Sequence, residues 1–283
     1  MSRPRIPILT IALAGMLVVA CSGGSRVPVP SSSAVVTATA LSSDLPSASG
    51  LAPLTYVAFG DSWPEGAHCG CRTFAGQWAD ALPALTGRPI DFIDLTGQKE
   101  PGFVGAETSQ SLATSLTLNE RTRDAVRKAD IVLIATGPND MDLIFDKLPG
   151  HACGGSDDSD CIRDLGKVWA TNFATILTTI DDLRDGKPTV IRLVDASNAF
   201  LFDPAMRAGL EPEFATTRGA LIYQLLNDAM CDAAAQHHAV CVDIRALLTG
   251  PNLDQAADEN SAASMEAIAR ALLDSGVAEL GGS

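Results

Sequence analysis

Short apolar runs alternate with longer stretches of helical periodicity along the chain after residue 52. The runs are rich in Val, Ile, Leu and Phe and have the length of buried parallel strands; they lie at 56–59, 90–95, 131–135, 190–194 and 239–242. Helical patterns follow them at 73–85, 118–128, 162–183, 218–236 and 265–273. This alternation predicts an α/β fold, a three-layer sandwich around a five-stranded parallel sheet, with ligands bound beyond the carboxyl ends of the strands.

The first twenty residues predict an export signal and not part of the fold. Arg3 and Arg5 precede an apolar run at 6–20 that is short for a membrane span, and a small residue stands before Cys21. This arrangement resembles a bacterial lipoprotein signal, in which Cys21 becomes the lipid-anchored N-terminus; a plain secretion signal is the alternative. Both predict a chain that leaves the cytoplasm. With the lipoprotein signal, membrane contact is expected only through the lipid on Cys21.

Residues 21–52 are expected to form a flexible tether, and residues 53–283 one domain. The tether is composed mainly of Ser, Pro, Val, Ala and Thr, without helical or alternating periodicity, so it buries too little apolar surface to offset the entropy of ordering. The remaining segment is long enough for a single large core, and it contains no repeat or second linker.

The chain is strongly acidic. It has 20 Lys and Arg against 34 Asp and Glu, a net charge of −14, which becomes −16 once Arg3 and Arg5 leave with the signal. Such a surface repels phosphate backbones and anionic headgroups, so nucleic acid is excluded as an expected partner.

Six cysteines remain after Cys21, and an even number in an exported chain favours disulfides. The favoured pairs join Cys153 to Cys161 and Cys231 to Cys241. Cys69 and Cys71 would form a strained ring if joined. A zinc site built from them with His68 is a disfavoured alternative, and no metal or cofactor is expected.

Candidate chemistry follows three of the predicted strands. Gly60-Asp61-Ser62 comes after the first, Gly105 after the second and Gly137-Pro138-Asn139-Asp140 after the third. In this order the motifs resemble the first three sequence blocks of the SGNH (GDSL) hydrolases, and the resemblance extends over the chain after the tether. It implies a flavodoxin-like SGNH fold. Gly102 also follows the second strand, and Gly105 is preferred because its flanking residues look more like the family's second block.

The resemblance implies an acyl-transfer site. Ser62 would attack an ester carbonyl, while its own amide, the amide of Gly105 and the side chain of Asn139 would hold the oxyanion. Donors aimed at that oxygen are each worth about 3 to 4 kcal/mol. Each residue alone has a structural alternative, a helix cap for Ser62 and Asn139 and a turn for Gly105. Together they favour a site, because three strand ends meet in one crevice.

This sequence does not match the fourth sequence block of the SGNH hydrolases. Anchoring on the last helix places the expected histidine of Asp-x-x-His at Glu259 and the aspartate at Ala256; a slip of one residue gives Asp258. No histidine follows His238. A carboxylate with an ordinary pKa near 4.3 accepts the serine proton less readily than an imidazole near 6.5.

Other histidines are alternative bases. His68 lies on a stretch broken by Pro64 and Gly66, and His151 lies in the loop after the third strand. His237 and His238 precede the last strand, at the opposite edge of the sheet, and are less suited. No base is assigned from the sequence, and Glu259 marks its expected position.

Two functions are therefore predicted. The first is an exported serine esterase that hydrolyses small acyl or acetyl esters through Ser62. The alternative is a degenerate member of the fold that only binds an acyl or glycan ligand, because the Asp-x-x-His is absent. The retained nucleophile and oxyanion donors favour the esterase.

Overall fold

A computed structural model describes residues 51–66, 69–97, 107–201, 203, 205–245, 247 and 261–281. All of them belong to one compact unit, Pro46–Ser283. The strands are β1 Leu54–Gly60, β2 Ile90–Thr96, β3 Ile131–Ala135, β4 Val190–Val194 and β5 Val240–Val242. They coincide with the five apolar runs to within two residues at each end. The signal segment with Cys21 and the tether up to residue 50 lie outside the described residues.

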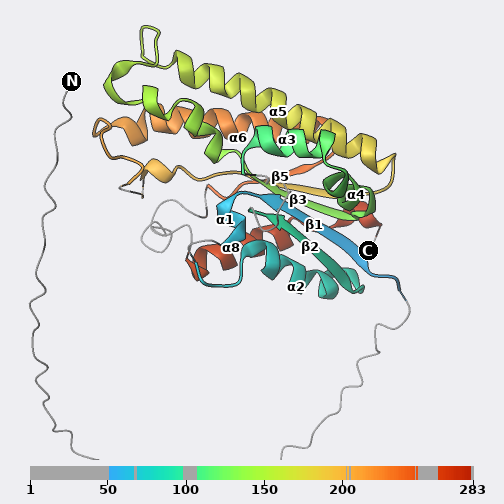
Figure 1. Cartoon of the computed structure of the whole chain (residues 1–283). Helices are drawn as coiled ribbons and strands as arrows, with labels where there is room; N and C mark the ends of the chain where they lie inside the picture. Colours follow the sequence, from blue (N-terminus) through green and yellow to red (C-terminus); the bar gives the residue numbers. More distant parts are fainter. Residues whose placement is uncertain are drawn as a thin grey trace, which may run out of the picture. The chain divides into compact units, whose positions relative to one another are not determined.

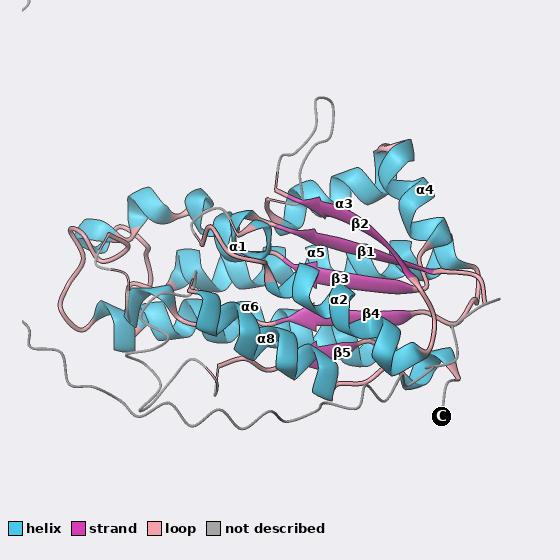
Figure 2. Ribbon diagram, turned by 90° about the horizontal axis from the view of Figure 1, so that it is seen from below, coloured by secondary structure: helices cyan, strands magenta, loops and turns pink. Residues whose placement is uncertain are grey.

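The five strands form one parallel sheet in the order β2-β1-β3-β4-β5. This order is that of a flavodoxin-like sheet, which reverses its direction of growth between β1 and β3. The register pairs Gly60 at the end of β1 with Thr96 of β2 on one side and Ala135 of β3 on the other. The segments that follow these three strands therefore start side by side at one edge of the sheet (Figure 2).

Helices cover both faces of the sheet, and this confirms the predicted three-layer α/β fold. The helices are α1 Ser62–Glu65, α2 Phe74–Thr86, α3 Ser109–Leu118, α4 Glu120–Lys128, α5 Asp160–Arg184, α6 Arg218–Gln236 and α8 Ala262–Asp274. The 3₁₀ turns are η1 Pro138–Leu143, η2 Phe145–Lys147, η3 Pro149–His151, η4 Ala199–Leu201, η5 Phe214–Thr216 and η7 Ala278–Leu280. Figure 1 shows α3, α4, α5 and α6 on one side of the sheet and α2 and α8 on the other. None of the helices in the described part of the chain combines the length and the apolar character needed to cross a membrane.

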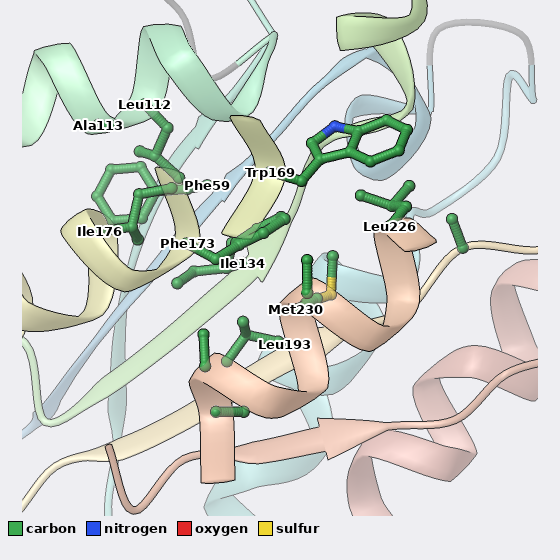
Figure 3. Packing of buried hydrophobic residues seen from close by; sticks show 14 of the residues in the cluster. Phe59, Leu112, Ala113, Ile134, Trp169, Phe173, Ile176, Leu193, Leu226 and Met230 are labelled. Carbon is green, nitrogen blue, oxygen red and sulfur yellow. The ribbon is translucent and has the colours of Figure 1, made fainter. Parts of the chain in front are cut away.

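The central strands β1, β3 and β4 are buried on both faces because their side chains alternate between two cores, whereas the outer strands β2 and β5 are partly buried. Val57 and Phe59 of β1 pack with α3, α5 and α6, whereas Tyr56 and Ala58 pack with α2 and α8. Figure 3 shows the larger core, in which Trp169 and other side chains of α5 meet those of α3, α6 and the sheet. Packing of helices on both faces therefore fixes the carboxyl ends of the strands in place.

One helix was not predicted from the sequence. The predicted helix at 118–128 is confirmed as α4, to within two residues, but α3 at 109–118 precedes it in a segment where no helix was expected. Asn119 separates them: its extended backbone ends α3, and its side chain accepts a hydrogen bond from Thr122 N to start α4. α3 is rich in Ser and Thr, which are weak helix formers, so its sequence is typical of a loop. Its start is fixed by a capping box between Thr108 and Ser111.

The six cysteines after Cys21 are paired. Disulfides join Cys153 to Cys161 and Cys231 to Cys241, the two favoured pairs. Cys69 is also joined to Cys71, against the expectation of a strained ring. Gly70 between them has φ +59°, and this left-handed turn brings the two Cα atoms to 5.0 Å, within the usual span of a disulfide. The zinc alternative is thereby removed, because these thiols are not available as ligands.

Candidate active site

Ser62 is presented by a sharp turn at the end of β1. A Cβ on Gly60 would lie 2.2 Å from Cγ of Pro64 and 2.5 Å from the carbonyl oxygen of Ala135. Only glycine therefore lets the chain turn this closely past β3. Two residues later Ser62 begins α1, and its side chain is exposed. The first amides of a helix lack partners within the helix, so the amide of Ser62 suits an oxyanion donor.

Asp61 fixes the start of this short helix. Its Oδ1 accepts a hydrogen bond of 3.0 Å from the amide of Trp63, which makes it the N-cap of α1. Trp63 is held in turn against the ring of Phe74, with centroids 5.2 Å apart. The nucleophile candidate thus stands on a turn fixed on both sides, and Asp61, not Ser62, is the capping residue.

Asn139 is placed by the turn after β3. Gly137 there has φ +127°, in the region that only glycine adopts freely, and its carbonyl accepts a hydrogen bond from Nε1 of Trp169. Asp140, which follows Asn139, is buried. Its Oδ2 accepts hydrogen bonds from the amide of Ser109 (2.9 Å) and from Nε1 of Trp169 (3.1 Å). These contacts tie η1 to α3 and α5, so the position of Asn139 is set by the core.

Ser62 and Asn139 line the same cavity, of about 170 Å³. The segment after β4 and helix α6 complete its described wall with Ala196, Ser197, Asp203, Met206 and Tyr223. A hydroxyl and a carboxamide therefore face a common space outside the carboxyl ends of β1 and β3, where ligands of such sheets bind. The segment 196–206 was not recognised from the sequence, because it carries no motif.

Asp61 was also not recognised from the sequence as part of the site, although it lies within the Gly-Asp-Ser motif. The residue borders the cavity and is 3% exposed. Burial raises its pKa from 3.8 to about 7, the hydrogen bond from Trp63 opposes the rise, and the negative charges of Asp140 and Glu107 add to it. The proton of Asp61 is therefore held more tightly in the folded protein than in the unfolded chain.

Asp61→Asn is expected to stabilise the protein at pH 8 and to matter less at lower pH. Because the pKa of Asp61 in the folded protein is raised to about 7, the protonated carboxyl stabilises the folded parent below pH 4. This stability is lost as the pH rises through 7. Asparagine keeps the cap acceptor without the charge. The free energy of unfolding of the variant should exceed that of the parent by about 1 to 3 kcal/mol at pH 8.

Urea denaturation of both proteins from pH 4 to pH 8 measures this difference. Asp142→Asn is a matched change at an exposed position of η1. The difference in free energy of unfolding between this variant and the parent should not increase with pH. If the difference in free energy of unfolding between Asp61→Asn and the parent stayed constant with pH, the raised pKa of Asp61 would be contradicted.

The described histidines lie away from this cavity. Nδ1 of His151 is 3.2 Å from Asp158, and Nε2 is 3.4 Å from Glu211, so this exposed ring bridges two acidic loops. His237 contacts Asp181 at 2.6 Å, and it lines with His238 a separate cavity where β4 and β5 begin, at the opposite edge of the sheet. Among the described residues that border the Ser62 cavity there is no histidine.

Several candidates lie outside the described residues: His68, Gly102, Gly105, Ala256, Asp258 and Glu259. The third oxyanion donor and the base therefore stay predictions from the sequence. Within the part of the chain that the structure describes, no cluster of three or more His, Cys, Asp or Glu side chains could hold a metal ion.

Comparison with known proteins agrees with this geometry. Residues 58–262 match the model of the GDSL-like lipase/acylhydrolase family. No curated protein matches the sequence. Among solved structures, the lipase Lip_vut3 from a goat rumen metagenome superposes with a TM-score of 0.61 at 18% identity, over 79% of this chain and 98% of that one.

Two further structures share the fold. Phospholipase A1 from Streptomyces albidoflavus NA297 gives a TM-score of 0.55 at 14% identity and covers 80% of this chain and all (100%) of that one. An extracellular lipase from Streptomyces rimosus gives 0.54 at 15% identity, over 79% and 100% of the two chains. At these identities the structures support the fold alone, whereas the family model spans most of the sequence. The chain belongs to the GDSL-like lipase/acylhydrolase family, as its strand-end motifs predicted.

Proposed function

We propose that this chain is an exported serine esterase, anchored through a lipid on Cys21, that hydrolyses small acyl or acetyl esters at Ser62. The observation that carries the proposal is that Ser62 and Asn139, from the ends of two neighbouring strands, line one cavity. Membership of a lipase and acylhydrolase family supports ester chemistry.

The proposed reaction proceeds through an acyl-enzyme. Oγ of Ser62 attacks the ester carbonyl carbon while its proton passes to a base, and the carbonyl oxygen becomes an oxyanion held by the amide of Ser62 and Nδ2 of Asn139. Collapse of this intermediate breaks the bond to the alcohol, which leaves with the proton. Water then attacks the acyl-enzyme in the same manner and releases the acid. The base is not assigned; Glu259 stands at the position where the family resemblance expects it.

A binding protein without catalysis is the second candidate. It is favoured by one observation: the described wall of the cavity contains no histidine, and the sequence has none after His238. In such a protein the cavity would hold an acyl or glycan ligand and the oxyanion donors would have no reaction to serve.

Hydrolysis of p-nitrophenyl acetate by the parent and by Glu259→His separates the two candidates. We expect the parent to exceed the spontaneous rate, and Glu259→His to raise kcat about tenfold or more, because an imidazole accepts the serine proton more readily near neutral pH. Asp254→His, a matched change in the same segment, should leave kcat at the parent value. A parent that reacts no faster than buffer, with activity gained only in Glu259→His, would reject the esterase.

A further inference from the structure

The cavity beside Ser62 contains a second carboxylate for which the proposed reaction has no use. Asp203 lies just beyond η4, in the segment between β4 and α6, and lines the same space as Ser62 and Asn139. The amide of Ala205 donates a hydrogen bond of 2.7 Å to its Oδ1. This bond fixes the side chain in an Asx turn and leaves Oδ2 available to a ligand.

No described positive charge neutralises this carboxylate. Among the described residues that border the cavity none is Lys, Arg or His, whereas both Asp61 and Asp203 are present. Arg207 is the nearest cationic residue in the sequence; it is exposed, and no ion pair joins it to Asp203 within the described part of the chain. The remaining polar groups of the wall, including Ser197 and Tyr223, are neutral.

The rest of the wall also suits a cation. Trp63 contributes an aromatic ring and Met206 a polarisable thioether, and both kinds of group tolerate an alkylammonium better than an anion. The net charge of the chain, −14, acts in the same direction over longer distances. A substrate that brings a negative charge into this space would meet repulsion from Asp203, and none of the described residues that border the cavity would offset it with a positive charge.

We propose that Asp203 is a specificity-determining residue that selects esters carrying an ammonium group close to the bond to be cleaved and disfavours anionic esters. The inference rests on the proposed function, because it names the substrate class of the same site. One carboxylate within a few ångströms of the ligand, in a medium of intermediate dielectric, favours a cation over a neutral group of the same shape by about tenfold.

Three thioesters of similar size test the selection. Acetylthiocholine is cationic, 3,3-dimethylbutyl thioacetate is its neutral isostere, and the S-acetyl derivative of 2-mercaptoethanesulfonate is anionic. In the parent, kcat/KM from released thiol should be about tenfold higher for the cationic ester than for the neutral one and lowest for the anionic one. The preference should shrink in 0.5 M NaCl, because salt screens an accessible charge.

Asp203→Asn isolates the carboxylate. Asparagine keeps the acceptor for the amide of Ala205 and removes only the charge. The variant should lower the ratio of cationic to neutral kcat/KM at least about threefold. Asp182→Asn, the same change at an exposed position of α5 outside the cavity, should keep the parent ratio. A ratio in the parent near one, or an unchanged ratio in Asp203→Asn, would overturn the proposal.

A binding measurement keeps the two proposals apart. Titration calorimetry of the full chain with choline and with 3,3-dimethylbutan-1-ol compares cation and isostere without any reaction. Tighter binding of choline to the parent, reduced in Asp203→Asn, would support the selection even if no ester were hydrolysed, and only the esterase would then be rejected. Equal binding of the two alcohols by the parent would overturn the selection whether or not the chain is an esterase.

Discussion

Ser62→Ala is expected to lower kcat/KM for p-nitrophenyl acetate by at least about a thousandfold. Removing the nucleophile of a serine hydrolase with a complete triad costs about a million-fold in kcat, and the loss expected here is smaller because the histidine of the Asp-x-x-His block is missing. The remaining rate reflects binding and the oxyanion donors. The side chain of Ser62 is exposed at the start of α1, so the substitution should leave the thermal unfolding midpoint unchanged.

Ser197→Ala is the control, because Ser197 is a second serine that lines the same cavity, from the segment after β4. Its effect should stay below about tenfold, since it supplies no bond to the acyl group. If both serine variants lost activity equally, the cavity would matter but Ser62 would not be its nucleophile. If Ser62→Ala kept the parent rate, the proposed reaction would be wrong.

Asn139→Ala is expected to lower kcat about a hundredfold to a thousandfold, with KM nearly unchanged. The loss of a single oxyanion donor has this size because the donor is needed most when the carbonyl oxygen gains its charge. Asn139→Asp should be at least as damaging, because it replaces a donor by an acceptor of negative charge. Steady-state kinetics on p-nitrophenyl acetate separate the two constants, and a large rise in KM at constant kcat would assign Asn139 to substrate binding instead.

The sheet was predictable because its central strands are covered by helices on both faces. Such strands are largely apolar, so β3 and β4 stand out from the chain as short runs. The exception in β4 is Arg192, which is buried and paired with Glu279. The two glycine turns beside the site were visible for a related reason. Gly60 and Gly137 occupy positions where any side chain would clash or be strained, and each lies in a motif.

Other features depend on contacts that a linear pattern does not contain. α3 is Ser-rich and Thr-rich, and is secured by its capping box and by the bond from Asn172 Nδ2 to Ser109 Oγ on the core side. The raised pKa of Asp61 arises from burial beneath the strand ends, with Asp140 and Glu107 close by. Asp203 was missed because a carboxylate in a loop has a functional meaning only once a nucleophile is seen to face the same space.

The described residues that border the Ser62 cavity include no histidine. The described histidines are held at sites other than the Ser62 cavity, and the expected position, Glu259, lies outside the described residues. A probe that reacts with an activated serine tests the nucleophile and the oxyanion donors directly, whichever residue is the base.

Labelling with a fluorophosphonate, followed by mass spectrometry of the digested protein, tests the central claim most directly. The account predicts one phosphonylated residue, Ser62, with labelling lost in Ser62→Ala and slowed in Asn139→Ala, because the phosphoryl oxygen occupies the place of the oxyanion. Absence of any label on the folded parent, or a label on Ser197 in place of Ser62, would contradict it.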